Sequence, residues 1–187
     1  MKKKTIIILA AFLILMVGAT ILYDNLSGDY DPSQLKEQDH EQKDDQTAEK
    51  LPMVDFVVYD ADGNEVNLFD YAGKPIVVNF WASWCNPCLG ELPAFEKAYE
   101  KYNGQVNFLM VNLTDGQRDT VEKVSDFVSK KEFKFPVFYD TDMNAAATYG
   151  VSSIPATLFI DENGYIVAGV TGAMNVVSLE ENISAIL

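Results

Sequence analysis

A short apolar run leads directly into two closely spaced cysteines, and this junction constrains the fold more than any other feature of the chain. Residues 76–81 have the length and the β-branched and aromatic composition of a buried strand. A helix is predicted from Pro87 to Tyr102, because proline suits the first helical position and apolar residues recur at helical spacing. Cys85 and Cys88 are therefore expected where a strand passes into the amino terminus of a helix.

Strands and helices alternate through the rest of the chain. Residues 53–68 predict a hairpin around a turn at 60–64. The turn begins like a calcium-binding loop, but Gly63 is at its fourth position, whereas such a loop needs glycine at the sixth. Pro93 predicts a kink in the helix that follows the cysteines. The remaining predicted strands are residues 106–113, 136–139, 156–160 and 165–170, and helices are predicted at 120–131 and 144–149. A last helix is predicted to begin with a capping box of Ser178 and Glu181. Its apolar face, which should pack on the sheet, consists of Leu179, Ile183, Ile186 and Leu187. Such alternation predicts an α/β fold with a parallel core and an antiparallel final pair.

Composition removes several classes of function. Residues 51–187 carry 19 acidic and 8 basic side chains, a net charge of −11, and nucleic acid is excluded as a partner because its phosphates would be repelled. The only histidine of the chain, His40, precedes this region. The folded part therefore cannot build a Ser-His-Asp triad, a Cys-His protease or a histidine-ligated metal site. No metal site is expected.

The amino-terminal 50 residues predict export. Three lysines precede an uncharged apolar run, residues 5–23, which is long enough to cross a bilayer as a helix with its basic end inside. Residues 1–23 are therefore expected to form a membrane anchor; cleavage as a signal peptide, giving a secreted protein, is the competing interpretation. Residues 24–50, with nine acidic residues and three lysines, predict a flexible linker. Residues 51–187 then form one domain on the extracytoplasmic side of the cell membrane.

The two cysteines are the only ones in the chain, and their spacing points to redox chemistry. At a helix amino terminus, free amides and the helix dipole stabilise a thiolate, so Cys85 is predicted to be the nucleophile and Cys88, one turn later, the resolving thiol. The alternative that the two cysteines are half of a zinc site would need the other ligands from a second chain, because residues 51–187 have no further cysteine and no histidine. A purely structural disulfide would close too small a loop to constrain the unfolded chain much.

The segment Phe80-Trp81-Ala82-Ser83-Trp84-Cys85-Asn86-Pro87-Cys88, with Gly90-Glu91-Leu92-Pro93 and Gly150-Val151-Ser152-Ser153-Ile154-Pro155, resembles the thioredoxin superfamily, specifically its membrane-anchored TlpA-like and ResA-like reductases. The resemblance spans about residues 51–187. It implies a thioredoxin-like fold, a mixed sheet flanked by helices with an amino-terminal hairpin and a central insertion. It also implies an extracytoplasmic disulfide reductase with no cofactor beyond its own disulfide, serving exported protein clients, for example in cytochrome c maturation, and re-reduced by a membrane thiol carrier.

The resemblance also assigns roles to residues around the cysteines. Pro155 would be a cis-proline facing them, and Ile154 would offer its backbone to an extended client; an ordinary trans-proline is the alternative. Glu91, three residues after Cys88, would exchange a proton with it, unless it is simply a solvent-facing acid. Trp84 would cover the reactive sulfur and contact the client, whereas Trp81 is expected in the core.

Some residues depart from the family pattern and leave alternatives open. Asn79 stands where thioredoxin has a buried aspartate, which makes Glu91 the expected proton acceptor. Asn86 and Pro87 form an active-site dipeptide that differs from thioredoxin and from ResA-like proteins at Asn86. The direction of electron flow does not follow from the motif, because potentials in this superfamily range from about −270 to −120 mV. An oxidase or isomerase, and a non-catalytic binding module, therefore remain alternatives.

Overall fold

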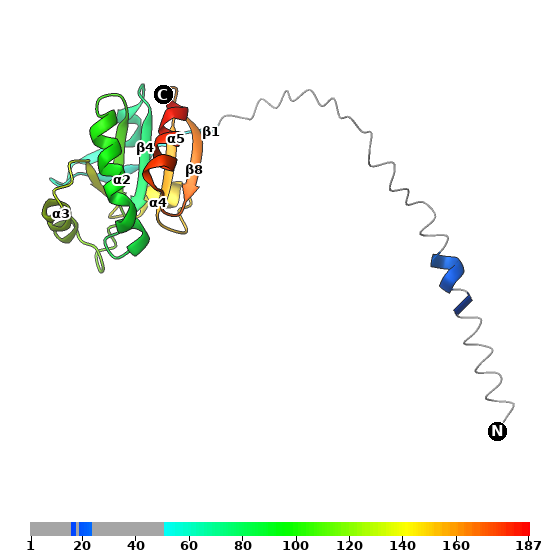
Figure 1. The fold of residues 1–187 in the computed structure, drawn as a ribbon. Helices are drawn as coiled ribbons and strands as arrows, with labels where there is room; N and C mark the ends of the chain where they lie inside the picture. Colours follow the sequence, from blue (N-terminus) through cyan, green and yellow to red (C-terminus); the bar gives the residue numbers. More distant parts are fainter. Residues whose placement is uncertain (1–15, 18, 24–50) are drawn as a thin grey trace. The chain divides into compact units, whose positions relative to one another are not determined.

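The structure of the protein, a computed structural model, describes residues 16, 17, 19–23 and 51–187 (Figure 1). The described residues before 24 are helical. Most of the predicted membrane anchor and the whole predicted linker, residues 24–50, lie outside the described residues. Among the residues that are described, no helix is both long enough and apolar enough to cross a bilayer.

A single mixed sheet of eight strands forms the centre of residues 51–187, in the order β1-β8-β7-β4-β5-β6-β2-β3. The strands β4, β5 and β6 are parallel, whereas β7 and β8 run antiparallel to their neighbours, as the alternation predicted. Every residue of β4 is buried, which agrees with a sequence that is apolar at every position but Asn79. The bounds are Leu51–Pro52 (β1), Val57–Tyr59 (β2), Glu65–Asn67 (β3), Ile76–Trp81 (β4), Asn107–Asn112 (β5), Val137–Tyr139 (β6), Ala156–Ile160 (β7) and Tyr165–Thr171 (β8).

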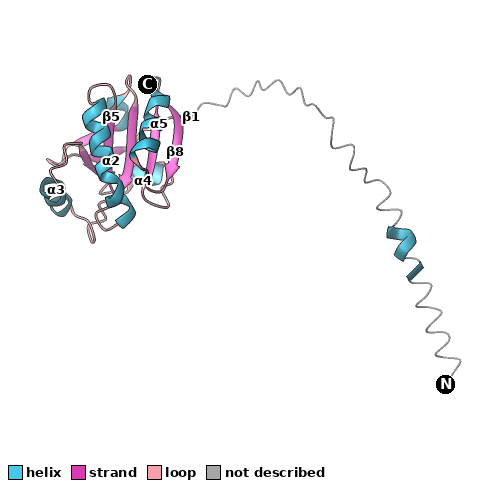
Figure 2. Ribbon diagram, in the orientation of Figure 1, coloured by secondary structure: helices cyan, strands magenta, loops and turns pink. Residues whose placement is uncertain are grey.

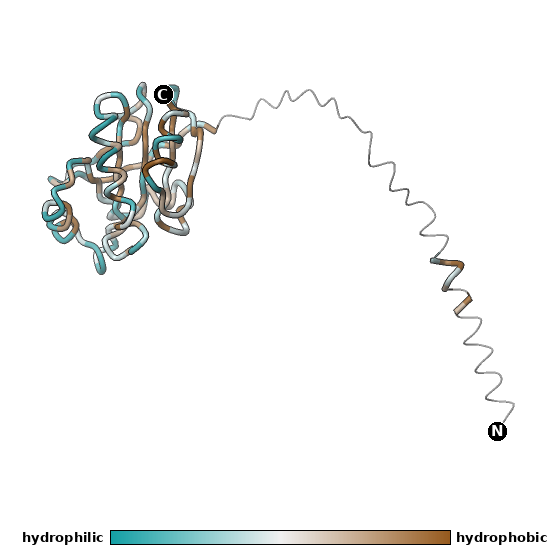
Figure 3. Tube along the Cα trace, viewed as in Figure 1, coloured by the Kyte–Doolittle hydropathy of each residue, from teal (hydrophilic) through white to brown (hydrophobic). Residues whose placement is uncertain are grey.

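Helices cover both faces of the sheet. They are η2 (Leu68–Tyr71), α2 (Asn86–Tyr102), α3 (Val121–Lys130), α4 (Asn144–Thr148) and α5 (Val176–Ile186). Figure 2 shows α2 and α5 lying over the same side of the sheet, where Leu92 and Ile183 join one apolar cluster. On the other side, α4 contributes Ala145 and Ala146 to a second cluster with Phe80. Figure 3 shows apolar residues along the central strands and hydrophilic residues around the outer turns.

The predicted hairpin and central insertion are both present. Strands β2 and β3 pair around a turn in which Asp60 Oδ1 accepts hydrogen bonds from the amides of Asp62 and Asn64, each at 2.9 Å. This carboxylate is thus used within the turn. The segment between β5 and β7 holds α3, β6 and α4, and the predicted central insertion lies in it. The helix α2 continues through Pro93 as one element, and the predicted kink there stays a prediction.

The start of the last helix differs from the prediction. Instead of a capping box at Ser178, Asn175 is the N-cap, and its side chain accepts a hydrogen bond from the Ser178 amide at 2.9 Å. Asparagine is among the strongest N-cap residues, so the helix begins three residues earlier than predicted. Leu187, predicted to face the sheet, is 60% exposed because it follows the last helical residue.

Candidate redox site

The two cysteines lie where β4 gives way to α2. Cys85 is the N-cap residue of α2, and its Sγ accepts a hydrogen bond from the Cys88 amide at 3.2 Å. The cysteines form a disulfide with a Cα–Cα distance of 5.2 Å. In the reduced protein, the same amide and the helix dipole would stabilise a thiolate on Cys85.

The two cysteines differ in their access to solvent. Cys85 is 6% exposed, whereas Cys88, in the first turn of α2, is completely buried. Pro87 occupies a first-turn position of the helix, where its missing amide costs nothing, and both Asn86 and Pro87 are exposed beside the disulfide. Cys85 is therefore the more accessible of the two cysteines, and its role as the nucleophile stays a prediction.

The loop before β7 faces the disulfide. The Ile154–Pro155 peptide bond is cis, as the resemblance implied, and the Ile154 carbonyl oxygen lies 3.8 Å from Cys85 Sγ. Pro155 is buried, while Ile154 is half-buried beside the sulfur. The sequence separates these residues from Cys85 by 69 positions, and the pairing of β7 with β4 brings them together.

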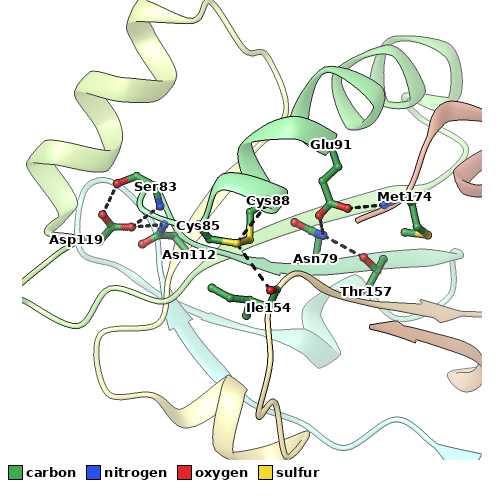
Figure 4. The surroundings of a disulfide bond; sticks show 10 residues. All are labelled: Asn79, Ser83, Cys85, Cys88, Glu91, Asn112, Asp119, Ile154, Thr157 and Met174. Atoms are coloured by element: carbon green, nitrogen blue, oxygen red, sulfur yellow. Dashed lines mark hydrogen bonds between the residues drawn. A yellow bond between two sulfur atoms is a disulfide. The ribbon is translucent and has the colours of Figure 1, made fainter. Parts of the chain in front are cut away.

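Glu91 is buried, not solvent-facing, so the second of the two interpretations of this residue is wrong. Its side chain is 1% exposed, and its two carboxylate oxygens accept hydrogen bonds from Asn79 Nδ2 and from the Met174 amide, each at 2.9 Å (Figure 4). Burial raises the pKa of Glu91 above its ordinary value, against the opposing effect of the two hydrogen bonds. The site therefore holds a buried acid one helical turn after Cys88.

Asn79 connects Glu91 to the sheet. Its Nδ2 donates to Glu91 and also to Thr157 Oγ1, at 3.0 Å, while its buried Oδ1 has no hydrogen-bond partner among the described residues. An asparagine cannot replace the aspartate of thioredoxin as a proton acceptor. The role of Glu91 as the proton acceptor stays a prediction.

The raised pKa of Glu91 predicts how stability depends on pH. The folded state holds the Glu91 proton more tightly than the unfolded state, so the contribution of Glu91 to stability is greatest below the ordinary glutamate pKa of 4.5 and is lost as pH rises through the raised value. In Glu91→Gln this pH-dependent loss should be absent. The loss in wild type amounts to about 1.4 kcal/mol of unfolding free energy for each unit by which the pKa is raised. Urea unfolding of both oxidised proteins across a pH series measures the difference.

The surface acid Asp126, with a side chain that is 76% exposed, offers a matched control for that comparison. Asp126→Asn should leave the pH profile of wild type unchanged. Parallel profiles for wild type and Glu91→Gln over the whole series would show that the Glu91 carboxyl titrates alike in the folded and unfolded protein, contrary to the prediction.

Trp84 and Trp81 divide as predicted between surface and core. Trp81 is fully buried and packs against Phe127, whereas Trp84 is 39% exposed. The Arg118 guanidinium lies over the Trp84 ring, 3.6 Å from its centroid. A groove of about 160 Å³ runs along this ring beside the cis-proline loop; it is lined by Trp84, Leu113, Asp115, Arg118, Met143, Val151, Ser152, Ser153 and Ile154.

Sequence reasoning missed a second polar cluster at this site. Asp119 is fully buried and accepts hydrogen bonds from Ser83 and from Asn112 Nδ2. Figure 4 shows this cluster on one side of the disulfide and Glu91 on the other. The available signal was a run of polar residues directly after a buried strand, at the edge where the cysteines also lie. Among the described residues, no group of three or more side chains could hold a metal ion.

Comparisons with known proteins agree on one family. The model of the AhpC/TSA family matches residues 49–168. The thiol-disulfide oxidoreductase ResA of Geobacillus thermodenitrificans is 35% identical over 133 residues, 71% of this chain and 74% of the relative. ResA of Bacillus thuringiensis is 30% identical over 182 residues, which cover 96% of this chain and 95% of the relative.

A solved structure supports the same assignment. The crystal structure of StoA from Bacillus subtilis superposes with a TM-score of 0.60 at 27% identity, covering 69% of this chain and 96% of StoA. The family model covers β4, the cysteine pair and the strands that follow as far as residue 168. The match to StoA agrees with the same thioredoxin-like fold. The chain therefore belongs to the thioredoxin-like AhpC/TSA family and is a thiol-disulfide oxidoreductase of the ResA and StoA type.

Proposed function

We propose that this protein is an extracytoplasmic disulfide reductase that acts on exported protein clients through Cys85 and Cys88. The observation that carries the proposal is the position of Cys85 as N-cap of α2, with the Cys88 amide 3.2 Å from its sulfur and the cis-proline loop opposite. This arrangement supports a thiolate on the more exposed sulfur and a client backbone beside it.

The reaction transfers two electrons to the client. The Cys85 thiolate attacks one sulfur of the client disulfide, so a mixed disulfide forms and the other client sulfur leaves as a thiolate. Cys88 then loses its proton and attacks Cys85 Sγ, which releases the second client thiolate and leaves Cys85 and Cys88 joined. The client thiolates take up two protons. No cofactor beyond the cysteine pair takes part.

Glu91 would accept the proton that Cys88 releases. It lies one turn after Cys88 on α2, and burial raises its pKa, which makes it a stronger base than an ordinary glutamate. Asn79 and the Met174 amide hold both of its oxygens, so its position is fixed during the exchange. Trp84 and Ile154 would contact the client, Trp84 from the groove and Ile154 through its backbone.

The amino-terminal sequence supports a membrane-bound protein with its domain outside the cytoplasm. The three lysines and the apolar run of residues 5–23 match an anchor whose basic end stays inside. The ResA relative that covers 96% of this chain extends the similarity over the same region. A membrane thiol carrier would then return two electrons to the Cys85–Cys88 disulfide, and cytochrome c maturation is one process that needs such a reductant.

The reduction potential of the cysteine pair tests the direction of this chemistry, because an oxidase would run the same steps in reverse. The full-length protein in detergent would be equilibrated with glutathione and, independently, with dithiothreitol buffers. A potential of about −250 mV or lower, near that of thioredoxin, is expected for a reductase. A potential near −120 mV, that of the oxidase DsbA, would overturn the proposed direction.

A further inference from the structure

The turn that carries the reactive cysteine is held from outside its own segment. Ala82 and Cys85 close the turn, with the Cys85 amide donating to the Ala82 carbonyl at 3.2 Å. Ser83 lies inside it, and both the Ser83 amide, at 2.7 Å, and the Ser83 hydroxyl donate to the carboxyl group of Asp119. Figure 4 shows Asp119 beside Ser83 on the side of the disulfide away from Glu91.

Asp119 is well placed to hold this turn. It is fully buried, and the oxygen that accepts from the Ser83 amide also accepts from Asn112 Nδ2 at 3.0 Å. Because Asn112 ends β5, the carboxyl group joins the turn to the sheet. Among the described residues, the other oxygen has two partners, the Ser83 hydroxyl and Lys123 Nζ, the second at 3.5 Å.

The loop that carries Asp119 is itself fixed. Asp115 Oδ1 accepts hydrogen bonds from the amides of Gln117, Arg118 and Asp119, at 2.9, 2.7 and 3.1 Å. The Arg118 side chain is bound to Asp115 Oδ2 through Nε at 2.9 Å and stacks over Trp84. Two consecutive residues of this loop, Arg118 and Asp119, therefore contact the two residues that precede Cys85.

We propose that Asp119 is a positioning residue of the redox site, which fixes the Ser83 turn so that Cys85 Sγ stays on the amino terminus of α2. The inference rests on the proposed function and deepens it. Without the carboxyl group, the Ser83 amide and Asn112 Nδ2 would be donors without acceptors in a buried site, and the turn would shift to satisfy them. A shift of the turn would move Cys85 relative to the Cys88 amide and the Ile154 carbonyl.

Two substitutions separate position from charge. Asp119→Ala removes every hydrogen bond to Ser83 and Asn112. Asp119→Asn retains them, because its oxygen can accept from the Ser83 amide and from Asn112 while its amide donates to the Ser83 hydroxyl oxygen, which can donate or accept. Asp126→Ala, on the exposed surface of α3, is the matched control for loss of an acidic side chain.

The test measures the rate at which iodoacetamide alkylates Cys85 in the reduced full-length protein, across a pH series, with the modified sulfur identified by mass spectrometry. Asp119→Ala should slow alkylation near neutral pH about tenfold, because a sulfur displaced from the Cys88 amide and the helix dipole is ionised less often, and one unit of lost thiolate stabilisation is a tenfold change. Asp119→Asn and Asp126→Ala should stay close to wild type. A wild-type profile for Asp119→Ala, or equal losses in the alanine and asparagine variants, would overturn the inference.

A milder variant covers the case in which Asp119→Ala does not fold. Ser83→Ala removes only the hydroxyl donor and should give a smaller loss in the same direction, whereas an unchanged alkylation profile would contradict the inference. This readout needs no client. If wild type fails to reduce any protein disulfide, the proposed function fails, and the alkylation rates still decide whether Asp119 positions Cys85.

Discussion

Replacing Cys85 with serine is expected to abolish disulfide exchange, lowering the rate of client reduction by at least about a thousandfold, as loss of the nucleophile does in other covalent mechanisms. A serine hydroxyl is not ionised at neutral pH and cannot form the mixed disulfide. Thiol release from a disulfide-containing protein, with dithiothreitol as the electron source and its own background subtracted, measures the effect.

The fold should tolerate this substitution. The Cys85–Cys88 disulfide spans three positions, so it constrains the unfolded chain little and its loss costs little stability. Urea unfolding of Cys85→Ser should resemble that of reduced wild type. Glu162→Gln, in the exposed turn between β7 and β8, is a matched control that should retain full activity. Residual exchange in a folded Cys85→Ser protein would place the chemistry elsewhere.

Local sequence was sufficient to predict most of the sheet and helices. The strand β4 has its predicted bounds, residues 76–81, because a run that is apolar at every position but Asn79 is suited to burial on both faces. The helix α2 begins one residue before its predicted start at Pro87, since Cys85 serves as the N-cap. The last helix was placed less well, because two capping signals compete there and Asn175 is used instead of Ser178.

The cysteine pair and the proline of the site could be identified from sequence because each belongs to a short contiguous motif. The burial of Glu91 could not be predicted from the sequence. Helical spacing placed it on the side of Cys88, but its burial depends on the Met174 amide, which comes from a segment 83 positions away and is delivered just before α5. A residue at the start of a helix looks equally well suited to solvent until that packing is known.

Asp119 and Arg118 were not predicted for a related reason. Asp119 reaches Ser83 across 36 positions, and Arg118 reaches Trp84 only because Asp115 folds the intervening loop back on itself. No periodicity or motif marks such contacts in one sequence. The signal that the sequence does offer is the run of polar residues after β5, because β4 and β5 are parallel neighbours whose carboxyl ends meet at one edge of the sheet.

The resolving role of Cys88 offers the most direct test of the whole account. In Cys88→Ser, Cys85 can still attack a client, but no second sulfur can release it, so a Cys85–client mixed disulfide is expected to accumulate. Non-reducing electrophoresis with mass spectrometry of the adduct measures it, and the double variant Cys85→Ser/Cys88→Ser is the control. An adduct is expected in the single variant alone. Absence of any adduct from a folded Cys88→Ser protein, while wild type still reduces the same client, would contradict dithiol exchange at this site.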